Sequence, residues 1–252
     1  MSDIREQITI IGKQQGGKSY LFGRLADIYA LNRGTVVVYN AKREKDYPRP
    51  EWTEIKPLSF LEHLKYIYTS KSARNEYKFS PSIEFFWMGK EMVHFERFNE
   101  IFFKRKVKIR AINDQKESAE FFATAHKYLS NCLFGIDDCR AFFRHGTKRA
   151  HIDFFSARDH SGQYSNIDTF KGVGMDVATI WHHPDHVVFD VWDYTTRTIL
   201  FKTKRYPELK KIDNPDFADA MRECYEILNE KEKYWYCELD NDSSSFSIRQ
   251  PI

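Results

Sequence analysis

Near its start the sequence carries a short apolar run, Ile8–Ile11, followed directly by the segment Gly12–Ser19, which reads GKQQGGKS. This segment matches the pattern GxxxxGK[ST], and apolar residues at helical spacing follow Gly17. Glycines let the backbone wrap closely around an anion, and the first turn of a helix offers that anion a partial positive charge. The pattern therefore predicts a buried strand, a phosphate-binding loop and a helix in direct succession.

Within this loop the side chains have expected roles toward a bound nucleotide. We expect Lys18 to reach the β- and γ-phosphates of ATP and the Ser19 hydroxyl to ligate Mg²⁺. The alternative is a glycine-rich turn that merely links a strand to a helix, but motif and context together favour a phosphate site. The residues expected to bind the nucleotide are Gly12, Lys13, Gln14, Gln15, Gly16, Gly17, Lys18, Ser19 and Tyr20.

Two carboxylates follow another apolar run, Cys132–Ile136, at the place where a neighbouring strand would end. A Mg²⁺–triphosphate site needs an acid there, so we assign Asp137 to the metal and Asp138 to polarising the attacking water. Glutamate is the commoner residue in the second role, and Asp138 departs from that choice. The alternative is a solvated strand end with ordinary acidic turn residues.

Strands and helices alternate along the chain, which predicts an α/β fold with a three-layer P-loop NTPase core and a mainly parallel central sheet. Apolar types make up 42% of the residues, enough for a sizeable core. Besides the first strand and the helix after Gly17, we expect strands at 35–39, 106–110, 132–136, 175–181 and 198–203, and helices near 59–68, 115–129 and 218–228.

The chain is expected to form one ATPase domain over residues 1–240. Residues 41–57, with three prolines and many charges, predict a surface connection, and about 70–112 predict an insertion that adds two strands to the core sheet. The Ser- and Asp-rich residues 241–252 predict a mobile tail.

Charge and hydropathy exclude several classes of protein. The 39 Lys and Arg nearly balance 36 Asp and Glu, for a net charge of +3, which excludes a histone-like polycation. No apolar run approaches the roughly 18 residues that a membrane span requires, and the start carries no signal-peptide pattern. We therefore expect an intracellular protein without a membrane span.

Three segments together resemble the FtsK–HerA superfamily of P-loop ATPases: Gly12–Ser19, Ile136–Phe143 and Val177–Pro184. The compact length is similar to that of the genome-packaging ATPases of membrane-containing and related viruses. The ATPase domain of zonula-occludens-toxin-like phage assembly proteins is also similar. The later segments are less specific than the first.

The resemblance implies an ASCE-type strand order, in which the strand ending at His182 lies between the loop strand and the acidic strand. It implies that His182, where the family commonly has Gln, senses the γ-phosphate. It also implies a homo-oligomeric ring in which an arginine reaches the neighbouring subunit's nucleotide. Arg158 is the first candidate, with Arg149 and Arg144 behind it, although residues 161–172 intervene where the family runs directly into the next strand.

From this resemblance we expect an ATP-hydrolysing motor that moves double-stranded DNA into a viral capsid, with ATP and Mg²⁺ as cofactors and a capsid or portal/vertex protein as a further partner. The expected location is the host cytoplasm, with association with the virion. The alternative is a phage assembly or secretion ATPase that acts on a protein partner.

Two basic segments and a group of three histidines each have more than one interpretation. The basic residues at 104–110 and at 202–211 fit either contacts with nucleic-acid phosphates or a solvated surface, and 104–110 fits a lysine-protected sheet edge. The histidines His182, His183 and His186 fit a nucleotide-sensing or structural role better than a zinc site, because no cysteine lies near them.

Overall fold

The computed structural model describes residues 5–32, 35–40, 52–55, 85–88, 91–94, 106–110, 115–128, 132–143, 148–162 and 174–250. In chain order the elements are β1 (Gln7–Ile11), α1 (Lys18–Asn32), β2 (Thr35–Asn40), β3 (Trp52–Ile55), β4 (Phe85–Met88), β5 (Glu91–His94), β6 (Lys106–Arg110), α5 (Gln115–Tyr128), β7 (Cys132–Asp137), α6 (Cys139–Phe143), α7 (Arg149–Ser156), the 3₁₀ turn η1 (Arg158–His160), β8 (Asp176–Trp181), the 3₁₀ turn η2 (Pro184–His186), α8 (Phe189–Tyr194), β9 (Arg197–Phe201), α9 (Pro215–Glu230), β10 (Tyr236–Asp240) and β11 (Phe246–Arg249). Within these parts of the chain, no helix combines the length and the apolar character that a bilayer crossing requires.

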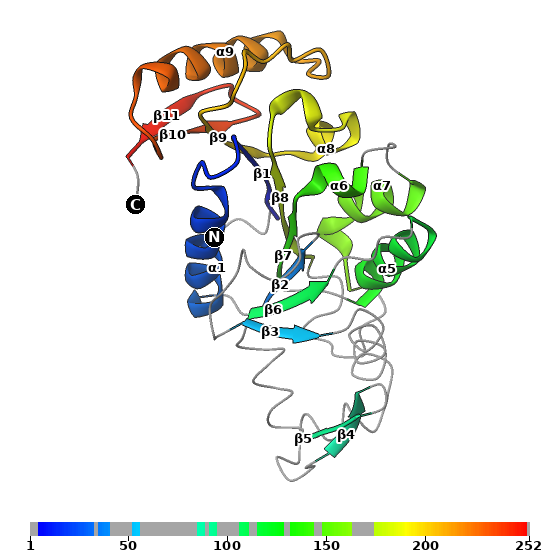
Figure 1. Cartoon of the computed structure of the whole chain (residues 1–252). Coiled ribbons are helices and arrows are strands. Elements are labelled where there is room, and N and C mark those ends of the chain that lie inside the picture. Colours follow the sequence, from blue (N-terminus) through cyan, green and yellow to red (C-terminus); the bar gives the residue numbers. More distant parts are fainter. Residues whose placement is uncertain are drawn as a thin grey trace.

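Nine strands form one sheet in the order β11-β10-β9-β1-β8-β7-β2-β6-β3 (Figure 1). All neighbours from β9 to β3 pair in parallel, whereas β10 and β11 are antiparallel additions at the other edge. Strand β8 lies between β1 and β7, so the predicted ASCE-type order is confirmed. Because these strands are parallel, the ends of β1, β7 and β8 meet at one edge of the sheet.

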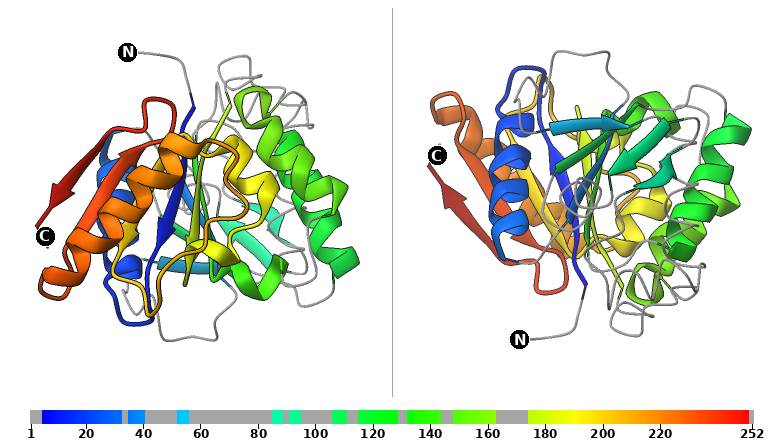
Figure 2. Two further views of the ribbon diagram at one scale, coloured as in Figure 1. Left: turned by 90° about the horizontal axis from the view of Figure 1, so that it is seen from above. Right: turned by 90° about the horizontal axis from the view of Figure 1, so that it is seen from below.

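Helices cover both faces of this sheet, as expected for a parallel sheet whose strands are buried on both sides. Figure 2 shows α1 against one face and α5, α7 and α8 against the other. Successive residues of β1 point to opposite faces: Ile10 packs with Phe22 of α1, and Ile11 belongs to the core on the far side. The predicted three-layer architecture is therefore confirmed.

The core around β7 explains why this strand contains a glycine. On the α1 face, a Cβ at Gly135 would lie 2.3 Å from Cζ of Phe22, so only glycine leaves room for that ring. On the other face, the Phe134 ring lies 5.0 Å from that of Phe154 and 6.0 Å from that of Phe122, in edge-to-face arrangements. The strand carrying the acidic pair is thus fixed from both sides.

The region predicted as an insertion at 70–112 divides into two parts. Strands β4 and β5 pair with each other in a separate two-stranded sheet, so they add nothing to the core sheet. Strand β6 lies inside the main sheet between β2 and β3, so the proposed sheet edge at 104–110 is wrong, and the insertion boundary near 112 stays a prediction. Alternating charges suggested a peripheral strand, but pairing partners decide where a strand lies.

Three strands, β3, β10 and β11, are absent from the sequence prediction. Strand β3 falls within residues 41–57, where prolines and charges predicted only a surface connection. Strand β11 falls within the predicted mobile tail and pairs with β10, with Ile248 opposite Cys237. A tight turn explains β11: Asp240 Oδ1 accepts hydrogen bonds from the backbone N–H and hydroxyl of Ser243, both at 2.8 Å. The predicted helix at 59–68 lies outside the described residues.

Candidate functional site

The loop predicted to bind phosphate joins the end of β1 to the start of α1. Its first residues are anchored on both sides. The Gly12 N–H donates to the carbonyl of Trp181 at 3.1 Å, and the Lys13 N–H donates to the carbonyl of Lys202 at 3.1 Å. The loop therefore starts from a fixed position between the ends of β8 and β9.

The glycines of the loop are required by its shape. A Cβ at Gly12 would lie 2.6 Å from the Cβ of Phe201, and a Cβ at Gly16 would lie 2.8 Å from the Lys13 carbonyl oxygen. Gln15 and Gly17 both have positive φ values, 59° and 101°. Left-handed residues within a tight loop turn successive N–H groups toward one concave face, which is how a backbone binds an anion.

Lys18 begins α1 and is 5% exposed. Its Nζ donates hydrogen bonds to the carbonyl oxygens of Gly12, at 2.7 Å, and of Lys13, at 2.8 Å. The ammonium group is thereby held inside the curve of the loop, at the position where this motif needs a positive charge.

Three polar side chains from three different elements meet at this end of the sheet. Lys18 Nζ lies 3.5 Å from Nδ1 of His182, and Nε2 of the same ring lies 3.4 Å from Oδ1 of Asp138. His182 directly follows β8, and Asp138 directly follows β7. The histidine ring thus connects the loop lysine to the second carboxylate of the acidic pair.

The two acids at the end of β7 face different surroundings. Asp137 is buried, and its Oδ1 accepts a hydrogen bond from the Asp138 N–H at 2.9 Å. Asp138 has a φ of 55°, a left-handed conformation that aspartate tolerates better than most residues. The two carboxylates thus differ in burial, since the Asp138 side chain is 22% exposed, which is consistent with the different roles that we assigned to them.

A hollow of about 450 Å³ opens beside the loop. It is lined by Gln14, Gln15, Gly16, Gly17, Lys18, Ser19, Tyr20, His182 and Tyr234. Sequence reasoning singled out all of these residues except Tyr234, which lies more than 200 positions from the loop. No motif marks Tyr234, because its proximity depends on the antiparallel return of β10.

Near the site, the His186 ring packs beside that of His183, with the ring centroids 5.5 Å apart. Burial, together with the positive charges of Arg140 and Arg205 and the nearby His183, lowers the pKa of His186 to about 4. His183 is itself fixed, because its Nδ1 accepts from the Asp185 N–H at 3.3 Å and its Nε2 lies 3.1 Å from the Arg205 carbonyl oxygen. These contacts hold the His183 ring in place and indicate a structural role for it.

The residues present fit a magnesium–nucleotide complex. Within the described ranges, no group of three or more His, Cys, Asp or Glu side chains is arranged to hold an ion by itself. Mg²⁺ in nucleotide sites needs few protein ligands, because phosphates and waters complete its octahedron. A serine hydroxyl on the loop and a buried carboxylate, Ser19 and Asp137, make up the donor set that such a site uses.

The candidate arginines are not brought to the loop. Arg158 is only 8% exposed, and its Nε donates to the carbonyl oxygen of Arg5 at 3.3 Å, next to the amino-terminal end of β1. The Arg149 side chain is 86% exposed and lies 2.9 Å from Asp153. Arg144 lies outside the described residues. A role across a subunit boundary stays a prediction for these residues.

Some of the basic residues at 202–211 hydrogen-bond to backbone carbonyls of the same chain. Lys202 Nζ donates to the Asn229 carbonyl at 2.9 Å, and Lys211 Nζ donates to the carbonyls of Asp185 and Val187. Lys204, Arg205, Lys210 and Lys211 are all exposed, and Lys210 Nζ lies 2.8 Å from a carboxylate oxygen of Glu208. Most of these basic residues therefore lie on the surface, although several of them have partners within the chain.

Comparisons with known proteins bear on the fold. No protein-family model matches the chain, and no curated protein matches it. Solved structures do match. The genome packaging NTPase B204 from Sulfolobus turreted icosahedral virus 2, in complex with ATP-gammaS, matches with a TM-score of 0.61 at 14% identity over 100% of both chains. This chain has the fold of a genome-packaging NTPase.

Related structures give the same result. The AMPPCP complex of B204 matches at a TM-score of 0.60 and 15% identity, over 98% of each chain. The DNA-packaging ATPase B204 from Sulfolobus Turreted Icosahedral Virus matches at 0.56 and 13%, over 100% of both chains. The structural resemblance to viral packaging ATPases predicted from the sequence is therefore confirmed at the level of the fold.

Proposed function

We propose that this protein is an ATP-hydrolysing motor of the FtsK–HerA type that translocates double-stranded DNA into a viral capsid. The contact of Lys18 with Asp138 through His182, beside an open hollow on a phosphate loop, is the observation that carries the proposal. The fold supports it, because the structures that share this fold include a packaging NTPase solved with ATP analogues.

In this proposal the concave N–H groups of Gly12–Ser19 and the ammonium of Lys18 hold the triphosphate. Ser19 and Asp137 would hold Mg²⁺, which supplies positive charge that stabilises the phosphates during transfer. Asp138 orients the attacking water and accepts its proton. Its carboxylate is suited to this role because it is partly exposed and contacts His182, which lines the hollow.

His182 links occupancy of the loop to the acid. A γ-phosphate held by Lys18 would lie near Nδ1 of the same ring whose Nε2 faces Asp138. When the phosphate is present, the ring and the ammonium both gain an anionic partner. The position of Asp138 then depends on whether the γ-phosphate is present, which is what a sensor residue has to accomplish.

The proposal also includes assembly of several subunits into a homo-oligomeric ring. An arginine from a neighbouring subunit would add charge stabilisation to a loose phosphoryl transition state, an effect that positioned cations supply in related chemistry. Arg158 is the sequence candidate, and Arg149 is the more exposed alternative. We place the protein in the host cytoplasm or with the virion, with a capsid or portal/vertex protein as partner.

The test is ATP hydrolysis with and without duplex DNA, for wild type and Lys18→Ala, at several salt concentrations. We expect duplex DNA to stimulate the wild type, with stimulation falling steeply as salt rises because phosphate contacts release counterions. Lys18→Ala should remain inactive in every condition. Hydrolysis that DNA does not stimulate, but a purified capsid or membrane protein does, would support the assembly or secretion ATPase instead.

A further inference from the structure

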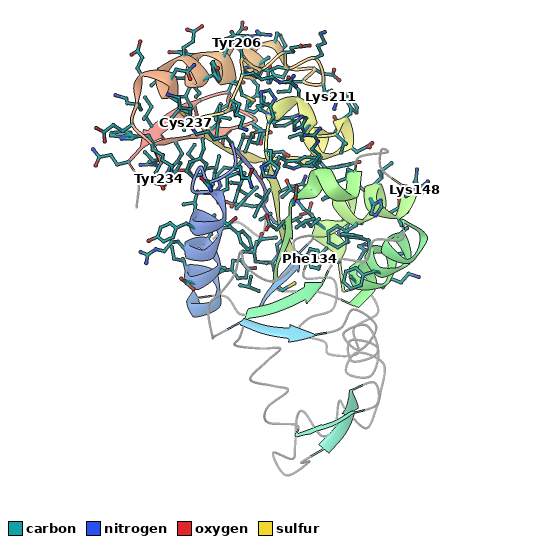
Figure 3. The ribbon with its side chains drawn as sticks, viewed as in Figure 1. Phe134, Lys148, Tyr206, Lys211, Tyr234 and Cys237 are labelled. Carbon is teal, nitrogen blue, oxygen red and sulfur yellow. The ribbon has the colours of Figure 1, made fainter. Side chains whose placement is uncertain are left out.

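Among the described residues that line the hollow, Tyr234 is the one that neither the phosphate loop with the start of α1 nor His182 supplies. It precedes β10, in the connection that leaves α9. Figure 3 shows its side chain beside the amino-terminal end of α1. Tyr234 therefore brings the carboxyl-terminal part of the chain to the rim of the phosphate site.

The tyrosine ring lies directly against the loop backbone. A Cβ at Gly17 would lie 3.2 Å from Cδ1 of Tyr234 and 3.3 Å from Cε1 of Phe201. Tyr234 is nevertheless 45% exposed, so much of this ring remains in contact with solvent at the hollow. Tyr20, on the first turn of α1, is a second exposed aromatic residue lining the same space.

The backbone at Tyr234 is in an unfavourable conformation for its residue type. Its φ is 78°, in the left-handed region that disfavours a residue with a bulky side chain. Glycine or asparagine would suit this position better on conformational grounds alone. Residues held in such conformations occur preferentially at ligand sites, where the placement of the side chain compensates for the strain.

The ammonium group of Lys233 contacts the Tyr234 ring. Lys233 Nζ lies over the Tyr234 ring, 4.6 Å from its centroid, and Lys231 Nζ lies 5.2 Å from the ring centroid of Trp235. Such cation–π contacts are attractive and orient a ring that would otherwise rotate in solvent. The aromatic surface beside the loop is thus held in place before any ligand arrives.

We propose that Tyr234 forms the nucleobase subsite, stacking on the base of the nucleoside triphosphate whose phosphates the loop binds. The inference rests on the proposed nucleotide binding and adds the residue that recognises the base. An aromatic ring next to the loop offers the π surface on which a base stacks, and stacking of this kind contributes substantially to binding in nucleic-acid complexes.

The experiment compares two ligands, ATP and inorganic tripolyphosphate, each with Mg²⁺, by titration calorimetry on the full chain. The variants are Tyr234→Phe, which keeps the ring, and Tyr234→Asn, which removes the ring but suits the left-handed backbone. We expect Tyr234→Asn to weaken ATP binding about tenfold and to leave tripolyphosphate binding unchanged. Tyr234→Phe should bind both ligands like the wild type.

A matched control is Tyr206→Asn, which changes another exposed tyrosine that packs against Tyr225 and does not line the hollow. It should leave both affinities unchanged. Because asparagine relieves the strained backbone, the melting temperature of Tyr234→Asn should stay level or rise, so weaker ATP binding could not be attributed to unfolding.

The outcomes distinguish a failure of the base subsite at Tyr234 from a failure of the proposed nucleotide binding. Equal weakening of ATP and tripolyphosphate in Tyr234→Asn would overturn the base subsite, because the ring would then only support the loop. Unchanged ATP binding would overturn it as well. Wild-type protein that binds neither ligand would instead overturn the proposed nucleotide function, and with it the subsite.

Discussion

The two ends of the same parallel strands are built differently. At the amino-terminal edge, buried Asp176 accepts hydrogen bonds from the Glu6 N–H at 2.8 Å and from the Tyr29 hydroxyl at 2.7 Å, with Arg5 3.7 Å away. At the carboxyl-terminal edge, the Lys18–His182 and His182–Asp138 contacts are long, 3.5 and 3.4 Å. The buried carboxylate at the amino-terminal edge thus has close hydrogen-bond donors, whereas the His182 contacts at the carboxyl-terminal edge are longer and lie beside an open hollow.

Positive φ values occur at both edges. Gln15, Gly17 and Tyr234 line the hollow at the carboxyl-terminal edge, and Gly174 precedes β8 at the amino-terminal edge. At the amino-terminal edge, burial and the charge of Asp176 raise the pKa of Tyr29, so this hydroxyl stays protonated as a donor. We infer that the amino-terminal edge stabilises the fold and that the carboxyl-terminal edge is where a ligand changes the contacts.

The largest effect should come from disrupting the amino-terminal edge. Asp176→Ala removes a buried carboxylate and leaves its donors without their acceptor, so we expect the free energy of unfolding to fall by about 3–5 kcal/mol. Asp153→Ala, which breaks the exposed pair with Arg149, should cost less than about 1 kcal/mol. Urea denaturation measures both, and equal small losses would contradict the comparison.

The carboxyl-terminal edge should respond in activity rather than in stability. Asp138→Asn keeps the size of the side chain but removes its charge, so we expect ATP turnover to fall by about 10²-fold. The melting temperature should change little, because Asp138 is partly exposed and its ion pair is long. Steady-state hydrolysis beside a thermal melt measures this, and retained turnover would remove Asp138 from the proposed chemistry.

Away from both edges of the sheet, His151 should make the stability of the fold depend on pH. Burial lowers the pKa of His151 to about 4 from its usual 6.5, because the ring packs between Phe122 and Phe143. The unfolded chain therefore takes up a proton at higher pH than the folded chain. This contribution to stability is complete above about pH 6.5 and is lost progressively as the pH falls toward 4.

Between pH 7 and pH 5 the loss should be about 2 kcal/mol from this residue. Denaturation at both pH values, for wild type and His151→Gln, measures it. The variant should show a smaller difference between the two pH values. His160→Gln, which changes an exposed histidine of η1, should keep the wild-type difference. An unchanged slope in His151→Gln would show that His151 is not the responsible group.

The smallest effect is expected from Arg158, because it belongs to the amino-terminal edge. In mixtures of wild type and Arg158→Ala, we expect hydrolysis to fall no further than the fraction of variant, with a lower melting temperature. Arg149→Ala is the matched comparison, since its side chain is exposed. Activity below the proportional line for Arg158→Ala would instead support the trans role predicted from the sequence.

Features that depend on a contiguous stretch of sequence could be predicted, and features that depend on distant partners could not. The phosphate loop, the acids after β7 and the strand ending at His182 were predictable because each is set by a contiguous motif. Strand β3, strand β11 and the position of Tyr234 were not, because each depends on a pairing partner far away in the chain. Arg158 shows the same limit: its residue type was conspicuous, but only the tertiary structure reveals that it is buried beside Arg5.

The central claim is that the curve of Gly12–Ser19 binds the phosphates of a nucleotide. A crystal structure with Mg²⁺ and a non-hydrolysable ATP analogue tests it most directly. We expect the β- and γ-phosphates inside the loop, with Lys18 Nζ turned from the carbonyls of Gly12 and Lys13 toward them. A nucleotide bound elsewhere, with Lys18 still on those two carbonyls, would contradict it.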